Sequence, residues 1–158
     1  MGKKLSILMF SGEFDKALAA LVLANTAREI DMEVNMFFAF WGLLLVRDPN
    51  KLTDEDKTIY EKIIANLTPK GIEELPLSRM NFAGIGKMML EEMMEGSDTP
   101  PIEAFLKGAI NKGVKLRACK LSCKVMGFKE DEFLDQVEIA TASDYLDEAS
   151  MADIQLFI

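Results

Sequence analysis

The sequence predicts a single-domain α/β fold, in which a mostly parallel central sheet of about five strands is flanked by helices. Two observations support this prediction. Short apolar runs typical of buried strands alternate with segments of helical periodicity along the chain, as in parallel sheets covered by helices. The length of 158 residues, with 49% hydrophobic and 28% charged residues, fits one globular domain, residues 1–158, with a sizeable core.

The first strand, helix and second strand are expected within residues 5–42. Residues 5–10 form a compact apolar run that ends at Ser11 and Gly12, which predicts a buried strand leading into a helix. The apolar face of that helix repeats at i, i+3, i+4, i+7 and i+8 and consists of Phe14, Ala17, Leu18, Leu21 and Val22. A second strand over residues 33–40 ends at Trp41 and Gly42, and the crossover between the two strands should be right-handed.

A second helix and a Met-rich segment follow in residues 53–98. Thr53 is the expected N-cap of the helix, because the three acidic residues after it suit the positive end of a helix dipole. The expected apolar face of this helix consists of Ile59, Ile63, Ile64 and Leu67. Residues 75–98 are expected to form a Met-rich helical insertion, helical over residues 87–94, whose methionines indicate core or an oligomer contact rather than a ligand groove.

The last third of the chain continues the alternation. A helix begins in the proline-containing segment at Thr99 and is expected to stop at Gly113, the usual residue after a helix end. The remaining expected elements are a strand over 114–118 that ends at Cys119, short helices over 121–126 and 131–134, a strand over 137–140, a helix over 141–150 and a strand over 153–158.

Composition and charge argue against several classes of protein. The amino-terminal apolar run is too short for a signal peptide, and the longest uncharged run, residues 34–46, is shorter than the roughly 17 residues that cross a bilayer. We therefore expect a cytoplasmic protein with no membrane partner. The net charge of −8 disfavours a nucleic-acid partner.

The residue types present also limit the chemistry. The chain has no histidine, which removes the Cys-His and Ser-His-Asp nucleophile pairs and the commonest zinc ligand. Two cysteines are too few for a closed zinc site, and no phosphate-binding glycine motif is present. We expect neither a metal nor another cofactor.

The charges are unevenly distributed along the chain. Residues 107–124 contain six basic side chains and no acidic one, whereas residues 129–158 contain nine acids and one lysine. Both cysteines lie inside the basic block. We expect the acidic carboxyl-terminal part to form a solvated face of the protein. The alternative is that it forms a surface for docking a basic partner.

Cys119 is the residue that we expect to carry the chemistry. It ends a predicted strand and precedes a predicted helix, so the helix dipole, together with Arg117, Lys120 and Lys124, would favour its thiolate. The competing interpretation is a small buried apolar residue at the strand end. Cys123 lies one helical turn later, a weaker signal for a redox dithiol than the Cys-x-x-Cys spacing.

A substrate crevice is expected beside this cysteine. In open parallel sheets, ligands bind outside the carboxyl ends of the strands. Three predicted strands end there, at Ser11 and Gly12, at Trp41 and Gly42, and at Cys119. We therefore expect Trp41 and Ser11 to line the crevice, with Arg117 and Lys120 as charge stabilisers.

Several segments resemble the DsrE/DsrF-like family of small sulfur-relay proteins, in the branch labelled peroxiredoxin-like. They are residues 118–127 (ACKLSCKVMG), 38–42 (FAFWG), 77–82 (LSRMNF) and the ending with Val137, Tyr145 and Phe157. The resemblance implies a DsrE-like α/β domain, a homo-oligomer that is often a trimer or a hexamer, and a cysteine that carries sulfane sulfur as a persulfide or thiosulfonate. Cys119 occupies the family's cysteine position, whereas the position of Cys123 is commonly methionine, so its role does not carry over.

Three hypotheses remain from the sequence. The first is a sulfur carrier or sulfurtransferase that uses Cys119 and exchanges sulfur with other thiol or sulfur-relay proteins or with small anionic sulfur compounds. The second is a non-catalytic oligomeric interaction module with an inert Cys119. The third is a dithiol reductase that uses Cys119 and Cys123.

Overall fold

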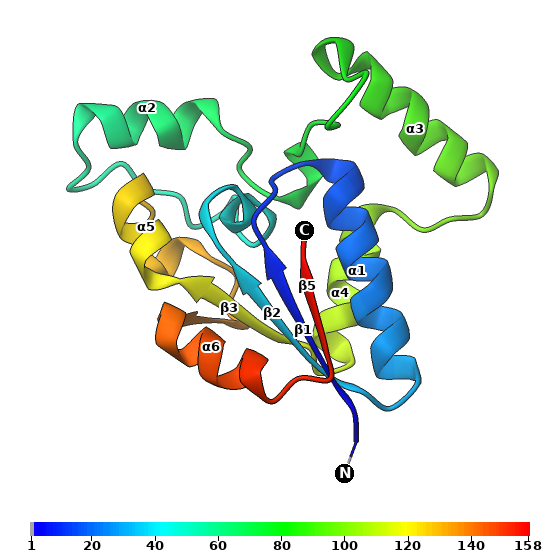
Figure 1. Cartoon of the computed structure of the whole chain (residues 1–158). Coiled ribbons are helices and arrows are strands. Elements are labelled where there is room, and N and C mark those ends of the chain that lie inside the picture. Colours follow the sequence, from blue (N-terminus) through cyan, green and yellow to red (C-terminus); the bar gives the residue numbers. More distant parts are fainter. Residues whose placement is uncertain (1) are drawn as a thin grey trace.

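The computed structural model describes residues 2–158, which form one α/β domain around a five-stranded sheet (Figure 1). The strand order is β4-β3-β2-β1-β5, and all neighbouring strands are parallel. The strands are β1 (Lys4–Met9), β2 (Glu33–Phe38), β3 (Lys115–Cys119), β4 (Val137–Ala140) and β5 (Ile154–Phe157). The expected parallel sheet of about five strands is therefore confirmed.

Six α-helices and four short 3₁₀ turns connect these strands within the described residues. The helices are α1 (Phe14–Glu29), α2 (Ile59–Leu67), α3 (Ile85–Gly96), α4 (Ile102–Asn111), α5 (Lys120–Met126) and α6 (Ala142–Ser150). The 3₁₀ turns are η1 (Phe40–Leu45), η2 (Ile72–Glu74), η3 (Phe82–Gly84) and η4 (Glu130–Glu132). None of the helices in residues 2–158 combines the length and the apolar character that crossing a membrane requires.

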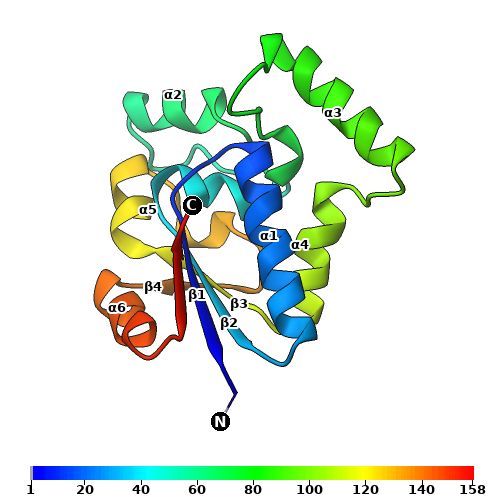
Figure 2. The same cartoon turned by 45° about the vertical axis from the view of Figure 1, so that its right-hand side comes forward.

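The two faces of the sheet are covered unequally, with α1 and α4 on one face and α6 on the other (Figures 1 and 2). From β1 to β4 each strand is added on the same side of the previous one, so right-handed crossovers place the connecting helices on one face. The connection from β4 to β5 runs back across the sheet, and the same handedness places α6 on the opposite face.

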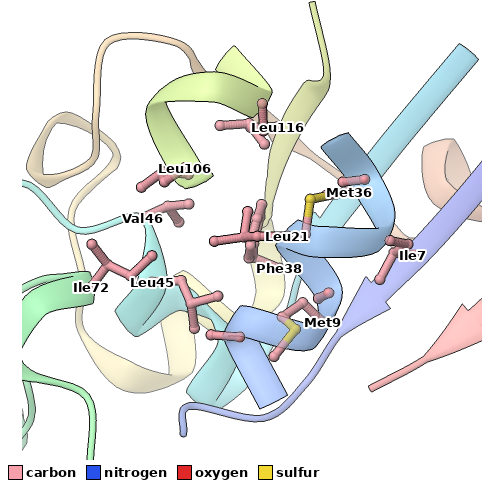
Figure 3. Packing of buried hydrophobic residues seen from close by; sticks show 14 of the residues in the cluster. Ile7, Met9, Leu21, Met36, Phe38, Leu45, Val46, Ile72, Leu106 and Leu116 are labelled. Carbon is pink, nitrogen blue, oxygen red and sulfur yellow. The ribbon is translucent and has the colours of Figure 1, made fainter. Parts of the chain in front are cut away.

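The large core lies on the face covered by α1 and α4 (Figure 3). Strand residues Ile7, Met36 and Leu116 pack there with Leu21 of α1 and Leu106 of α4. A smaller apolar cluster lies on the α6 face and contains Cys119.

A close backbone approach fixes the end of β2. The amide of Ala39 donates a 3.0 Å hydrogen bond to the carbonyl oxygen of Met9, at the end of β1. A Cβ atom at Gly42 would lie 1.9 Å from that same oxygen, so only glycine fits at this point of η1. The second strand consequently ends at Phe38 and not at residue 40 as expected, because the chain turns into η1.

The prediction of Thr53 as the N-cap of the second helix is wrong. Thr58 caps α2 in a capping box with Glu61, in which each side chain accepts a hydrogen bond from the other residue's amide. The amide of Thr53 donates instead to the buried carboxylate of Glu132. The expected apolar face also differs, since Ile59, Ile63 and Leu67 are exposed.

Buried charges anchor the loop that precedes α2. Lys57 Nζ donates to both carboxylate oxygens of Glu132 at 2.7 and 2.8 Å, and both side chains are almost completely buried. The guanidinium of Arg47 lies 4.4 Å from the ring centroid of Phe128 and donates to the carbonyl of Pro69. These contacts tie residues 47–69 to the segment that follows α5.

We predict that Gly42→Ala destabilises the protein by about 2 kcal/mol, because the new methyl group must displace the backbone at Met9. Gly96→Ala is the control, since a Cβ atom there meets nothing within 4 Å. It should change the free energy of unfolding by less than about 1 kcal/mol. Urea denaturation measures both effects, and equal stabilities of the two variants would contradict the prediction.

Candidate functional site

The alternation of side chains along β3 places Cys119 on the α6 face of the sheet. Leu116 and Ala118 belong to the large core, whereas Cys119 belongs to the small cluster on the opposite face. Cys119 is the last residue of β3 and the N-cap of α5, and its thiol makes no capping hydrogen bond. The predicted strand end and following helix are therefore confirmed.

The Cys119 side chain lies in an apolar nest and is 7% exposed. Phe37, Ala39 and Ala140 form the buried part of this nest, and the partly buried Leu8 and Tyr145 pack against it. The ring of Tyr145, from α6, stacks on Phe37 with a centroid distance of 4.9 Å. The first turn of α6, which carries Tyr145, thus covers the face of the sheet on which the Cys119 thiol lies.

Contrary to what the sequence indicated, the basic side chains of residues 107–124 do not all surround Cys119 as free charges. Arg117 was expected as a charge stabiliser, but its guanidinium lies 2.8 Å from Glu148 and 3.6 Å from Glu138. Its charge is therefore compensated by acids of the carboxyl-terminal part, which is not simply a solvated face. Lys120 and Lys124 are exposed on α5 and form no ion pair within residues 2–158.

Cys123 occupies a different environment from Cys119. It belongs to the large core and is 3% exposed. Burial, with smaller contributions from Cys119 and Glu130, raises the pKa of the Cys123 thiol from about 9 to about 12. Both cysteines are free, and Cys123 is protonated at neutral pH, which disfavours the dithiol hypothesis.

The two loops that were expected to line the crevice, at residues 11–12 and 41–42, are in contact with each other. Gly12 and Trp41 both line a hollow of about 260 Å³, and a Cβ atom at Gly12 would lie 2.7 Å from the Trp41 carbonyl oxygen. Ser11 is held to the end of β5, because its amide donates to the carbonyl of Ile158 at 3.2 Å. Cys119 does not line this hollow, so the crevice and the thiol are separate features of the same sheet edge.

Local sequence patterns do not predict the surroundings of Tyr145, on α6, or of Ser122, in the first turn of α5. The sequence does not predict that Tyr145 covers the thiol, because this placement depends on the strand order that sends α6 to this face. Ser122 is fully buried, and its hydroxyl has no hydrogen-bond partner. It is the third residue after the N-cap, the position whose side chain can reach back toward the capping residue. Ser122 lies between the two cysteines of residues 118–127, and its sequence position does not show that its hydroxyl is buried.

Three exposed or half-exposed rings form a cluster at the same edge. Phe10 lies 5.8 Å from both Phe40 and Phe157, measured between ring centroids. Phe40 has a left-handed backbone with φ of 50°, which is unfavourable for a bulky residue. Within residues 2–158, no group of three or more acidic or cysteine side chains is arranged to hold a metal ion.

Comparison with known proteins gives one family. The model of the DsrE/DsrF/DrsH-like family matches residues 1–157. The uncharacterized protein YrkE of Bacillus subtilis (strain 168) is 36% identical over 156 residues, which cover 99% of this chain and 97% of YrkE. The sulfur carrier protein DsrE2 of Allochromatium vinosum is 28% identical over 170 residues, covering 99% of this chain and 98% of that protein.

A solved structure shares the fold. The crystal structure of the ychN protein from E. coli aligns over 100% of both chains with a TM-score of 0.52 and 14% sequence identity. At this identity the likeness concerns the fold alone, and it agrees with the predicted α/β domain.

We predict that the Cys123 thiol makes the protein less stable in alkaline solution. Its pKa is about 12 in the folded chain and about 9 in the unfolded chain, so above pH 9 the unfolded state loses a proton that the folded state keeps. At pH 10.5 this should cost about 2 kcal/mol relative to pH 8.

Urea denaturation of the native protein and of Cys123→Ala at both pH values isolates this effect from other titrating groups. The free energy of unfolding should fall less between pH 8 and pH 10.5 in Cys123→Ala. Identical losses in the two proteins would show that Cys123 does not titrate in this way.

Proposed function

The chain belongs to the DsrE/DsrF/DrsH-like family, and on this basis we propose that it is a sulfur carrier or sulfurtransferase that holds sulfane sulfur on Cys119. The main support is the position of Cys119, which ends β3 and caps α5 at the carboxyl edge of a parallel sheet. The relative from Allochromatium vinosum is described as a sulfur carrier protein, which supports the same class of function. Both cysteines are free thiols, as expected in the reducing cytoplasm where we propose that the protein acts.

The proposed loading step is a thiol-disulfide type exchange. The Cys119 thiolate attacks the outer sulfur of a persulfide donor, the donor S–S bond breaks, and a new S–S bond forms on Cys119. The donor leaves as a thiolate, and the outer sulfur keeps its proton or releases it to water. Transfer to an acceptor thiolate repeats this exchange in the opposite direction, so no cofactor is needed.

The surroundings of Cys119 favour a persulfide over a thiosulfonate. The nest is apolar, and Arg117 is already paired with Glu138 and Glu148, so no free cation of β3 would hold a sulfonate. We include the unpartnered hydroxyl of Ser122 in the proposal as a hydrogen-bond donor to the outer sulfur. Lys120 and Lys124 on the neighbouring exposed surface would attract anionic sulfur compounds to this edge.

Tyr145 would control access to the sulfur. Its ring lies over the nest and Cys119 is 7% exposed, so a donor or acceptor must displace the first turn of α6 to reach the thiol. Partners would then be other thiol or sulfur-relay proteins that can hold this turn open, together with small sulfur compounds that need less space.

We predict that polysulfide adds sulfur to Cys119 and not to Cys123. Intact-mass spectrometry of the reduced protein should show increments of about 32 Da per sulfur, and the thiosulfonate adduct of about 112 Da from tetrathionate should form to a smaller extent. Cys119→Ser should abolish these adducts, whereas Cys123→Ser should keep them because the Cys123 thiol is buried and protonated. The two variants are matched controls for each other.

The other two hypotheses are tested with the same proteins, by the adduct masses and by a disulfide-reductase assay. Absence of an adduct on the native protein would support an interaction module with an inert Cys119. Loss of disulfide-reductase turnover in both variants would support the dithiol reductase.

We also propose that the protein forms a homo-oligomer, a trimer or a hexamer. Ile59, Tyr60 and Leu67 of α2 and Leu121 and Val125 of α5 are exposed apolar side chains on neighbouring helices. A nine-residue helix is too short to be stable without tertiary contacts, and a second copy of the chain would cover this surface.

We predict that Ile59→Glu with Leu67→Glu lowers the mass in solution to that of the 17.7 kDa monomer. The two charges would have to be buried in the interface without partners. Leu146→Glu on α6, where the native leucine is also exposed, should leave the mass unchanged. Light scattering gives the mass, and a native protein that is already monomeric would contradict the proposal.

A further inference from the structure

A groove separates α3 from the start of α4 and lies outside the thiol site. Its volume is about 820 Å³. Phe14 of α1, Met94 of α3 and Ile102 of α4 form a buried apolar floor, and the exposed Met88 adds a flexible side chain to it. None of the residues in the Cys119 nest lines this groove. It is therefore a separate surface of the protein.

The rim of the groove is strongly acidic. Its charged side chains are Glu91, Glu92, Glu95, Asp98 and Glu103, and no basic residue is among those that line it. Lys87 lies near one end, 3.8 Å from Glu91 and 5.3 Å from the Phe14 ring centroid, and compensates one of these charges. The other four acids form no ion pair within residues 2–158.

Apart from Glu91, which pairs with Lys87 one turn earlier, the acids on α3 do not stabilise this helix. All three lie in the second half of α3, near the negative end of the helix dipole, and the last turn contains no basic residue. Such an arrangement weakens a helix, so the acids are better explained by something that binds beside them. The negative end of α3 adds to the attraction for cations in the groove.

The α3 helix has few partners of its own. Met94 is its only buried residue, while Met88, Met89 and Met93 are largely exposed. Figures 1 and 2 show α3 standing apart from α1 and α4, and joined to α4 by the loop over residues 97–101. A 12-residue helix in water is marginal alone, so a ligand that packs along it would supply missing contacts.

The far end of the groove is rigid. Asp98 adopts a left-handed backbone with φ of 56°, and the amide of Thr99 donates to the carbonyl of Met94 at 2.8 Å. Pro100 and Pro101 follow and restrict the loop further. The loop that closes this end of the groove is therefore restricted before anything binds, whereas the α3 wall depends on further contacts.

We propose that this groove binds a basic amphipathic helix of a partner protein. Methionine side chains adapt to the apolar face of a bound helix, and carboxylates on the rim attract lysines and arginines on its polar face. The groove runs beside α3, whose 12 residues span about 18 Å, which corresponds to three turns of a bound helix. An acidic partner helix would be repelled by the same rim.

The test uses a fluorescent 16-residue amphipathic peptide of leucine and lysine and, as a comparison, a scrambled peptide of the same composition without an apolar face. Fluorescence anisotropy with the native protein should give at least about tenfold tighter binding for the amphipathic peptide. The groove variant is Glu92→Gln with Glu95→Gln and Asp98→Asn, which removes three unpaired charges with little change in shape.

The control variant removes three other exposed acids that form no ion pair, by Glu55→Gln, Glu130→Gln and Asp147→Asn. Both variants have the same net charge. Binding of the amphipathic peptide should weaken by about tenfold in the groove variant and by less than about threefold in the control variant. Met88→Gln should also weaken it, whereas Met151→Gln, at an exposed methionine outside the groove, should not.

Three outcomes would overturn the proposal. Equal binding of the two peptides, or equal weakening in the two triple variants, would show attraction by net charge alone. Absence of binding to the native protein would exclude this ligand. A groove variant that loses oligomers in light scattering, with no peptide bound to the native protein, would show that a second copy occupies the groove. Adduct formation on Cys119 is independent of all these results.

Discussion

The contact between Gly42 and the carbonyl of Met9 is the constraint on which the site depends. It ends β2 at Phe38, turns the chain into η1 and sets Ala39 beside the last residue of β1. Because Phe38 pairs with Ala118, the position of Ala39 also fixes what lies next to Cys119. The same turn projects Phe40 and Trp41 at the sheet edge and leads through Val46 to Arg47. The buried network of Arg47, Phe128 and Glu132 then holds the chain on both sides of this edge.

Sequence patterns predicted the elements well where one local signal determines them. The apolar run before Cys119 and the left-handed Gly127 after α5 mark a strand end and a helix end, and both were located correctly. The N-cap of α2 was not located correctly, because Thr53 and Thr58 are both threonines near acidic residues. The decision depends on Glu132, which is distant in the sequence and takes the Thr53 amide as a hydrogen-bond donor.

The place of Cys119 in the fold was predicted in part for the same reason. The apolar run before Cys119 predicts that it ends a strand. Which helix covers the face of the sheet that carries its thiol depends on the strand order, and the local sequence pattern does not contain the strand order. A count of charges along residues 107–124 indicated a basic environment. In the folded chain Lys112 pairs with Glu29, Lys115 with Glu33 and Arg117 with Glu148, so half of the six cations are compensated by distant acids. Ion pairs between residues distant in the sequence therefore decide which of these cations remain free to interact with a substrate.

The distribution of the remaining charges would separate the two proposed tasks of this chain, docking of a partner and sulfur transfer. Lys120 and Lys124 lie on α5, which directly follows Cys119, whereas four unpaired carboxylates gather between α3 and α4. Carboxylates close to the thiol would disfavour its thiolate and repel anionic sulfur donors. A partner held by the acidic groove would leave the edge with Cys119 free for exchange, so docking and sulfur transfer would not compete for one surface. Under both proposals, loss of peptide binding in the groove should leave sulfur loading of Cys119 intact, and loss of Cys119 should leave binding in the groove intact.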